Sequence, residues 1–313
     1  MAEIDALVTT MVESDGSDIH LSANRKPMMR VDGDMTPMDH PVLSSEDTGR
    51  LLEEIMPERN SRQLAETNDT DFSYEIEGFV RLRVNAFRDR FGIGGVLRVI
   101  PAEVISASAL GLPSGIMSFC DLSKGLVVVT GPTGSGKSTT LAAMVDHINE
   151  SRAEHIITIE DPIEFVHQDK RCLLNQREVH AHTTSFAAAL RAALRQDPDI
   201  VLVGEMRDLE TIQIAIETAE TGHLVLGTLH TNTAASTVDR IISVFPNQQQ
   251  NQIRNMLAGS LKGVVAQTLC RRRGGGRAAA FEIMVVDQGI AAMIRESKLQ
   301  QIPSAIQVGR KQG

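Results

Sequence analysis

The stretch Gly131-Pro132-Thr133-Gly134-Ser135-Gly136-Lys137-Ser138 decides how the chain is interpreted, because it has the pattern G-x-x-x-x-G-K-S of a phosphate-binding loop. It follows the apolar run 126–129, and residues 139–148 carry apolar side chains at helical spacing. A strand is therefore expected before the loop and a helix after it. In such a loop the glycines let backbone N–H groups approach phosphate oxygens, and the helix N-terminus favours an anion.

The side chains of this loop have separate expected roles. Lys137 brings a positive charge to the β- and γ-phosphates of a nucleotide, and the Ser138 hydroxyl is a ligand for Mg²⁺. We therefore predict that the loop binds ATP and Mg²⁺. The alternative, a glycine-rich turn that binds nothing, leaves the flanking strand and helix unexplained. The predicted nucleotide-binding residues are Gly131, Thr133, Gly134, Ser135, Gly136, Lys137, Ser138 and Thr139.

Two further apolar runs end in carboxylates. Residues 201–203 precede Glu205, which is the arrangement of a Walker B strand, whose carboxylate holds Mg²⁺ or polarises the attacking water. Residues 156–159 precede Glu160, and open α/β sheets bind ligands at this edge of their strands. We predict that Glu205 is catalytic and binds the metal, and that Glu160 is a general base or an outer contact of the metal. A helix cap or a turn is the alternative for Glu160.

The positions of the histidines relative to a predicted strand indicate which of them could act together. His223 precedes the predicted strand 224–229 and His230 follows it, so the two should lie at opposite ends and not share a metal. We expect His230 at the same edge as Glu205, where it could sense the terminal phosphate, although a lone histidine is usually structural. His180 and His182 are not predicted to bind a metal, because no third ligand has suitable spacing.

The order of predicted elements favours two domains. Residues 1–100 are predicted as a small α+β domain and 101–113 as a linker, and from 114 to 313 strands and helices alternate as in an α/β fold with a parallel sheet. The predicted strands of the second domain are 126–130, 155–159, 200–203 and 224–229. Its predicted helices are 137–149, 185–195, 209–219, 233–243 and 248–269.

Composition is that of a soluble globular protein, with 42% hydrophobic and 23% charged residues. No apolar run approaches the ~18 residues of a membrane span, so direct membrane insertion is not expected. The acidic N-terminal residues lack the pattern of a signal peptide, which favours a cytoplasmic location. The three cysteines are isolated, so neither a zinc site nor a disulfide framework is predicted.

Charge is unevenly distributed along the chain. Residues 1–77 carry 18 acidic and 6 basic side chains, whereas residues 78–100 carry one acid and five arginines. This balance argues against a nucleic-acid partner. For the arginine cluster, an exposed sheet face and an anionic partner both remain open. Residues 271–277 are expected to form a flexible basic loop.

Arg191 and Arg195 lie four residues apart and therefore share one face of a predicted helix. They could be solvated, pair with Asp197 or Asp199, or contact a phosphate or a neighbouring subunit.

Taken together, four stretches resemble the secretion ATPase superfamily of type II secretion and type IV pilus systems. They are the phosphate-binding loop, I-T-I-E-D-P-I-E-F at 157–165, L-V-G-E-M-R-D at 202–208 and T-G-H-L-V-L-G-T-L-H-T at 221–231. Within this superfamily the chain is similar to the type IV pilus retraction ATPases, with supporting stretches at 17–20, 83–87 and 294–298.

The resemblance implies a PAS-like N-terminal domain and a RecA-like ATPase domain in a homohexamer, with ATP between the two domains. It implies that Arg83 and Arg98 complete the nucleotide site and that Arg191 and Arg195 match arginines of the family. The implied function is pilus retraction through an inner-membrane platform protein, at the cytoplasmic face of that membrane, with other pilus ATPases as further partners. Ser297 departs from the family's glycine, and relatives continue beyond residue 313, so truncated C-terminal helices are expected.

Other functions remain open at this point. An assembly ATPase for pilus extension or type II secretion usually has a larger N-terminal region and a four-cysteine zinc insert, which this sequence lacks. A non-hydrolysing, ATP-binding regulatory subunit is disfavoured by Lys137, Glu160 and Glu205. A DNA translocase is disfavoured by the acidic balance.

Overall fold

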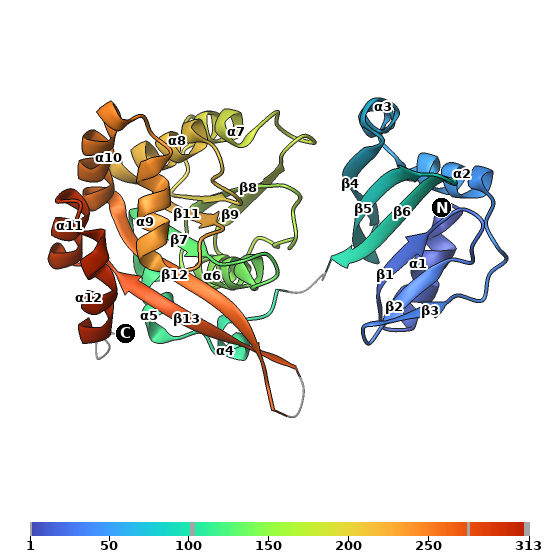
Figure 1. Ribbon diagram of the computed structural model, residues 1–313, viewed down its shortest axis with the longest axis horizontal. Helices are drawn as coiled ribbons and strands as arrows, with labels where there is room; N and C mark the ends of the chain where they lie inside the picture. Colours follow the sequence, from blue (N-terminus) through green and yellow to red (C-terminus); the bar gives the residue numbers. More distant parts are fainter. Residues whose placement is uncertain (1, 101–103, 274–275, 310–313) are drawn as a thin grey trace. The chain divides into compact units, whose positions relative to one another are not determined.

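The computed structural model describes residues 2–100, 104–273 and 276–309. The chain divides into two compact units, Met1–Ala102 and Glu103–Gly313 (Figure 1). Of the predicted linker 101–113, residues 101–103 lie outside the described residues. Within the rest of this segment, Ala107–Leu110 form the short helix α4, which was not predicted. The side chain of Ser106 caps this helix by accepting a hydrogen bond from the backbone N–H of Ala109.

Unit 1 is an α+β unit with an antiparallel sheet in the order β3-β2-β1-β6-β5-β4. Its core forms where apolar side chains of the sheet pack against apolar side chains of the helices, among them Leu82, Leu97 and Leu52. The helices are α1 Ile4–Glu13, α2 Ser45–Ile55 and α3 Glu58–Thr67. The strands are β1 Gly16–Leu21, β2 Met28–Val31, β3 Asp34–Pro37, β4 Asp69–Ile76, β5 Val80–Asp89 and β6 Gly92–Ile100.

Unit 2 has a sheet in the order β13-β12-β7-β11-β10-β8-β9, in which β13 alone among these seven strands runs antiparallel to its neighbour. This arrangement confirms the predicted α/β class. The strands are β7 Gly125–Thr130, β8 His155–Glu160, β9 Leu173–Glu178, β10 Ile200–Val203, β11 Leu224–Leu229, β12 Leu261–Arg271 and β13 Arg277–Val285.

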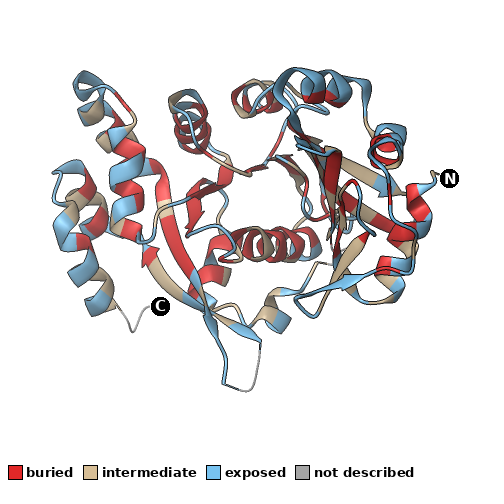
Figure 2. Cartoon of the chain, turned by 45° about the vertical axis from the view of Figure 1, so that its right-hand side comes forward, coloured by how far each residue is buried: buried red, intermediate tan, exposed pale blue. Residues whose placement is uncertain are grey.

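Helices cover both faces of this sheet, so its central strands are buried on both sides (Figure 2). Helix α6 packs on one face, and α7 to α10 pack on the other. Within the described residues, none of the helices is both long and apolar enough to cross a bilayer. The helices are α5 Ser114–Met117, α6 Lys137–Ser151, α7 Phe186–Ala193, α8 Leu209–Glu220, α9 Ala234–Ser243, α10 Asn247–Ser260, α11 Gln288–Arg295 and α12 Ile302–Val308, with 3₁₀ turns at Ser118–Asp121 and Leu299–Gln301.

The predicted helix 248–269 is wrong beyond residue 260. Helix α10 ends at Ser260, and β12 begins at Leu261 and pairs with β7 on one side and β13 on the other. A strand buried on both faces has no alternation of apolar and polar residues, so periodicity does not separate it from a helix. Strands β9 and β13 and helix α3 were also not predicted.

The predicted flexible basic loop 271–277 is partly strand. Arg271 ends β12 and pairs with Arg277, the first residue of β13. Residues 274–275 lie outside the described residues. The two strands form a hairpin arm whose described end carries only exposed arginines and one exposed glycine between 271 and 277.

The change Gly263→Ala tests the corrected assignment of residues 261–269. A Cβ atom at Gly263 would lie 2.1 Å from Cζ of Phe119, so we expect the free energy of unfolding to fall by about 1–3 kcal/mol. In a helix the same change would stabilise the protein. The exposed Gly259 of α10 has nothing within 4 Å of a Cβ, so Gly259→Ala should raise stability by about 0.5–1 kcal/mol. Urea unfolding measures the stability of both variants. Stabilisation by Gly263→Ala would contradict the assignment of residues 261–269 to a strand.

Candidate nucleotide-binding site

Four neighbouring parallel strands bring the predicted catalytic stretches to one edge of the unit 2 sheet. Strands β7, β11, β10 and β8 pair in register, with Thr130 opposite Leu229 and Val203 opposite both Gly227 and Ile159. The phosphate-binding loop follows β7, His230 follows β11, Glu205 follows β10, and Glu160 ends β8. Parallel strands have their carboxyl ends on the same edge, so all four stretches meet there.

The phosphate-binding loop is tied to the segment after β11. The hydroxyl of Thr130 donates a hydrogen bond to the carbonyl of Thr231 at 2.7 Å and accepts one from its N–H at 2.9 Å. Thr130 is the last residue before the loop, and Thr231 directly follows His230. This pair of bonds therefore fixes the start of the loop beside the histidine.

Lys137 is the first residue of α6, and its side chain turns back over the loop. Its Nζ donates hydrogen bonds to the carbonyls of Gly131 at 2.9 Å and Pro132 at 3.1 Å. Burial lowers the pKa of Lys137, and the negative charges of Glu205 and Glu164 oppose this shift. The ammonium group is thus held by carbonyls at the start of the loop, close enough to Glu205 for their charges to interact.

The loop fits an anionic ligand. Ser135 is buried, and its Oγ has no hydrogen-bond partner among the residues that the structure describes. Buried hydroxyls normally have a partner, so an unpaired one within a phosphate-binding loop indicates a place for a ligand oxygen. The backbone N–H groups at the start of α6 provide further donors for an anion.

Glu205 is held by two positively charged or hydrogen-bonding groups. His230 Nε2 lies 2.8 Å from Glu205 Oε1, and Arg207 Nε contacts the same oxygen. The segment that carries Glu205 is also tied to β11, because the backbone N–H of Met206 donates to the carbonyl of Thr228 at 3.0 Å. The structure therefore confirms the expected position of His230 beside Glu205. Arg207 was not predicted; its position two residues after the carboxylate was the available signal.

Glu160 is a carboxylate whose pKa is close to neutrality. Burial raises the pKa of Glu160 to about 6, and hydrogen bonds from Thr158 and Gln176 oppose this shift. Thr158 Oγ1 donates at 2.6 Å and Gln176 Nε2 at 3.1 Å, both to Glu160 Oε1. A carboxylate with a pKa near the working pH is suited to accept a proton from water. Thr158 and Gln176 were not predicted as contacts.

Two of the other histidines, His182 and His223, contact the backbone. His182 Nδ1 accepts a hydrogen bond from the N–H of Glu178 at 2.9 Å, which explains this residue without a metal. His223 lies at the opposite end of β11 from His230 and contacts the carbonyl of Thr218. Between residues 2 and 309, where the structure describes them, no three His, Cys, Asp or Glu side chains group as a metal site.

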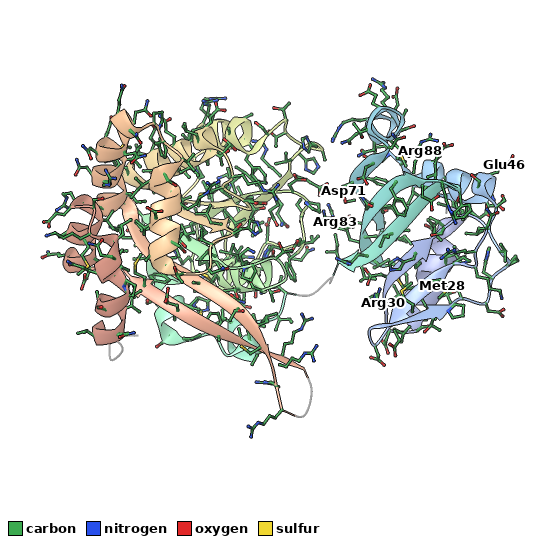
Figure 3. The ribbon with its side chains drawn as sticks, in the orientation of Figure 1. Met28, Arg30, Glu46, Asp71, Arg83 and Arg88 are labelled. Carbon is green, nitrogen blue, oxygen red and sulfur yellow. The ribbon has the colours of Figure 1, made fainter. Side chains whose placement is uncertain are left out.

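Arg83 and Arg98 lie opposite each other in strands β5 and β6 of unit 1. Arg98 Nε donates to Asp18 Oδ1 at 2.7 Å, and the Asp18 side chain is only 5% exposed. Arg83 Nε lies 3.4 Å from Asp71 Oδ1, and both residues are labelled in Figure 3. Two like charges side by side on a sheet repel each other, and these carboxylates offset that cost. The structure thus presents two adjacent guanidinium groups on one sheet face.

Arg191 lies in the last turn of α7, whereas Arg195 lies beyond the helix, which ends at Ala193 and not at residue 195 as predicted. Arg191 forms an ion pair with Glu210, near the start of α8, and Arg195 Nη1 donates to the carbonyl of Arg191 at 3.3 Å. The predicted ion pair is therefore present for Arg191, but its partner is Glu210 and not Asp197 or Asp199. Asp199 instead accepts a hydrogen bond from the N–H of His155 at 2.9 Å.

Comparison with known proteins identifies the family. Residues 1–291 match the family described as "Type II/IV secretion system protein". The chain is 51% identical, over 311 residues, to the type IV pilus retraction ATPase PilT of Pseudomonas aeruginosa, covering 99% of this chain and 90% of that protein. It is 50% identical over 288 residues to a twitching motility protein of Neisseria gonorrhoeae, covering 92% and 77%. Type II secretion system protein E of Aeromonas hydrophila is 35% identical, covering 86% of this chain and 54% of that protein.

Solved structures agree with this result. A crystal structure of the pilus retraction motor PilT with bound ADP has a TM-score of 0.92 and 47% identity, covering 98% of this chain and 90% of that one. The ATPase DotB of Legionella pneumophila has a TM-score of 0.88 and 30% identity, covering 99% and 87%. By sequence over most of its length and by fold, the chain belongs to the type II/IV secretion system protein family.

Proposed function

We propose that this protein is an ATP-hydrolysing motor that retracts type IV pili. The observation that carries the ATPase assignment is the meeting of the phosphate-binding loop, Glu205 and Glu160 at one sheet edge. The direction of work rests on the similarity to retraction proteins, which extends over 99% of this chain and 90% of the Pseudomonas protein.

Each residue at this edge has a chemical task in the proposed reaction. The loop N–H groups and Lys137 bind the β- and γ-phosphates, and Glu160 accepts a proton from the attacking water. Ser138 would hold Mg²⁺, which when bound neutralises charge on the phosphates, and Glu205 would contact that metal and polarise the attacking water. His230, on the Glu205 carboxylate, would position that carboxylate and lie near the terminal phosphate.

The assembly and its partners belong to the same proposal. The motor acts as a homohexamer at the cytoplasmic face of the inner membrane and works on an inner-membrane platform protein, with other pilus ATPases as further partners. At least one of Arg83 and Arg98 approaches the phosphates when the two units close on a nucleotide. Arg191 and Arg195 contact a phosphate or pair with a neighbouring subunit.

An assembly ATPase is the second candidate, because the type II secretion relative belongs to the same family. The match with that relative spans only 54% of its length, against 90% for the retraction ATPase. Counting pili on cells that lack the gene separates the two functions. Excess pili are the result expected for a retraction motor, and absence of pili would contradict retraction and favour assembly.

Glu205→Gln should separate binding from hydrolysis. The amide keeps the size of the side chain and removes the charge that polarises water, so we expect ATP to bind while turnover falls by roughly a hundredfold or more. Calorimetric titration with ATP measures binding, and phosphate release measures turnover. If binding disappears together with turnover, Glu205 acts mainly in holding the metal of the bound nucleotide.

Glu160→Gln should raise stability and abolish activity at the same time. The folded-state pKa of about 6 lies above the ordinary value of 4.5, so ionised Glu160 costs the folded state up to about 2 kcal/mol above pH 6. The cost fades as the pH falls from 6 towards 4.5. The variant should therefore be more stable than the parent at pH 8 and equal to it near pH 4.5.

Activity supplies the second half of this test. The parent's kcat/KM should fall as the pH drops through about 6, because Glu160 must be ionised to accept a proton. Glu220 is exposed and is the last residue of α8, so Glu220→Gln should change neither the stability nor the pH dependence of kcat/KM. Equal stability of Glu160→Gln and parent at pH 8 would contradict the burial cost.

Arg83→Ala and Arg98→Ala should lower turnover strongly and leave ATP affinity nearly unchanged, since the guanidinium groups stabilise charge that develops during transfer. Arginines of this kind contribute on the order of 10³–10⁵ in rate in GTPases. Lysine should rescue poorly, because it lacks the planar fork of donors. Arg62→Ala, which removes an exposed ion pair with Glu58, is the matched control. Steady-state turnover at the parent rate in both alanine variants, with assembly intact, would contradict the proposal.

A further inference from the structure

Gln267 lies beside the phosphate-binding loop although it comes from a distant part of the chain. It belongs to β12, which pairs with β7 on the side away from β11. The register places Ala266 opposite Thr130, so Gln267 is next to the first residue of the loop. The side chain is buried, with 5% exposure, and it is the last buried residue before β12 continues into the exposed hairpin arm.

The amide of Gln267 makes two buried hydrogen bonds that span the loop. Nε2 donates to the carbonyl oxygen of Ser135 at 2.7 Å, and Oε1 accepts from Thr140 Oγ1 at 2.8 Å. Ser135 lies within the loop, and Thr140 lies in the first turn of α6. The side chain of Gln267 thus connects the phosphate-binding loop to helix α6, which directly follows the loop.

Two loop glycines pack directly on this residue. A Cβ atom at Gly131 would lie 2.2 Å from the backbone oxygen of Gln267, and one at Gly136 would lie 2.9 Å from Gln267 Nε2. Both glycines also have positive φ angles, 148° and 86°. The close approach explains why the loop contains glycine at these two positions in addition to its need for backbone donors.

Peptide geometry gives the contact a consequence for binding. In a trans peptide the C=O of one residue and the N–H of the next point in opposite directions. The Ser135 carbonyl is directed at Gln267, so the N–H of Gly136 is directed away from Gln267. Loss of the Gln267 contact would free the Ser135–Gly136 peptide to rotate, and the N–H of Gly136 would then change direction.

We propose that Gln267 is a positioning residue for the nucleotide, which holds the Ser135–Gly136 peptide and the first turn of α6 in the orientation that binds phosphate. The inference rests on the proposed function in taking this loop as the nucleotide site. It goes beyond it by assigning a role to a residue outside the phosphate-binding loop and the carboxylate strands.

The test uses the full chain and measures the Kd for ADP by calorimetry together with KM, kcat and the urea midpoint. Gln267→Met keeps the bulk and removes both hydrogen bonds, so the Kd for ADP and the KM for ATP should rise roughly tenfold or more. The kcat should change much less, because the loop contacts the phosphates in both the ground state and the transition state.

The partner residue supplies a conservative rescue. Thr140→Val removes the hydroxyl and should raise the Kd for ADP by roughly fivefold, whereas Thr140→Ser keeps the hydroxyl and should bind within about twofold of the parent. Gln267→Met combined with Thr140→Val should bind no more weakly than Gln267→Met alone, since both remove one linked network. Thr268→Val, at the exposed neighbouring residue of β12, is the matched control and should match the parent.

The outcomes separate this inference from the proposed function. Failure of the parent to bind ADP would overturn the proposed function. A parent that binds ADP, with Gln267→Met binding equally well and only a lower urea midpoint, would overturn the positioning role and leave a purely structural one. Weaker binding by Thr140→Ser to the same extent as Thr140→Val would also contradict the proposed hydrogen bond.

Discussion

The parallel, in-register pairing of β7, β11, β10 and β8 is the constraint on which the rest of unit 2 depends. Each of these strands is buried on both faces and leaves the sheet at the same edge. Residues separated by up to 101 positions in the chain therefore come together at this edge. The hydrogen bonds between Thr130 and Thr231 show how closely the exits of two neighbouring strands are linked.

Charge at this edge is balanced within the protein. Glu205 is contacted by His230 and Arg207, and its charge acts on the buried ammonium of Lys137. Glu160 has hydrogen bonds from Thr158 and Gln176, yet burial still raises its pKa to about 6. The site thus keeps a cation and two carboxylates in a partly buried place, and among them Glu160 is suited by its raised pKa to accept a proton.

The parts of the site that the sequence predicted are those with a local pattern. A loop between a strand and a helix, and carboxylates after apolar strands, are visible in short windows, and the structure places Glu205, Glu160 and His230 accordingly. The strand β12 was taken for a helix, because it is buried on both faces. Gln267 was missed since its partner Ser135 lies 132 residues away, and the partners of Arg83 and Arg98 are likewise set by sheet register and not by spacing.

The most direct test of the account is phosphate release by the purified full chain and by its Lys137→Ala variant, with folding checked by circular dichroism. The hydrogen bonds of the Lys137 ammonium are to carbonyls of the loop itself, so the variant should fold. The account predicts ATP hydrolysis by the parent and only background release by the variant. Hydrolysis at the parent rate by a folded Lys137→Ala protein would contradict the claim that this loop is the catalytic nucleotide site.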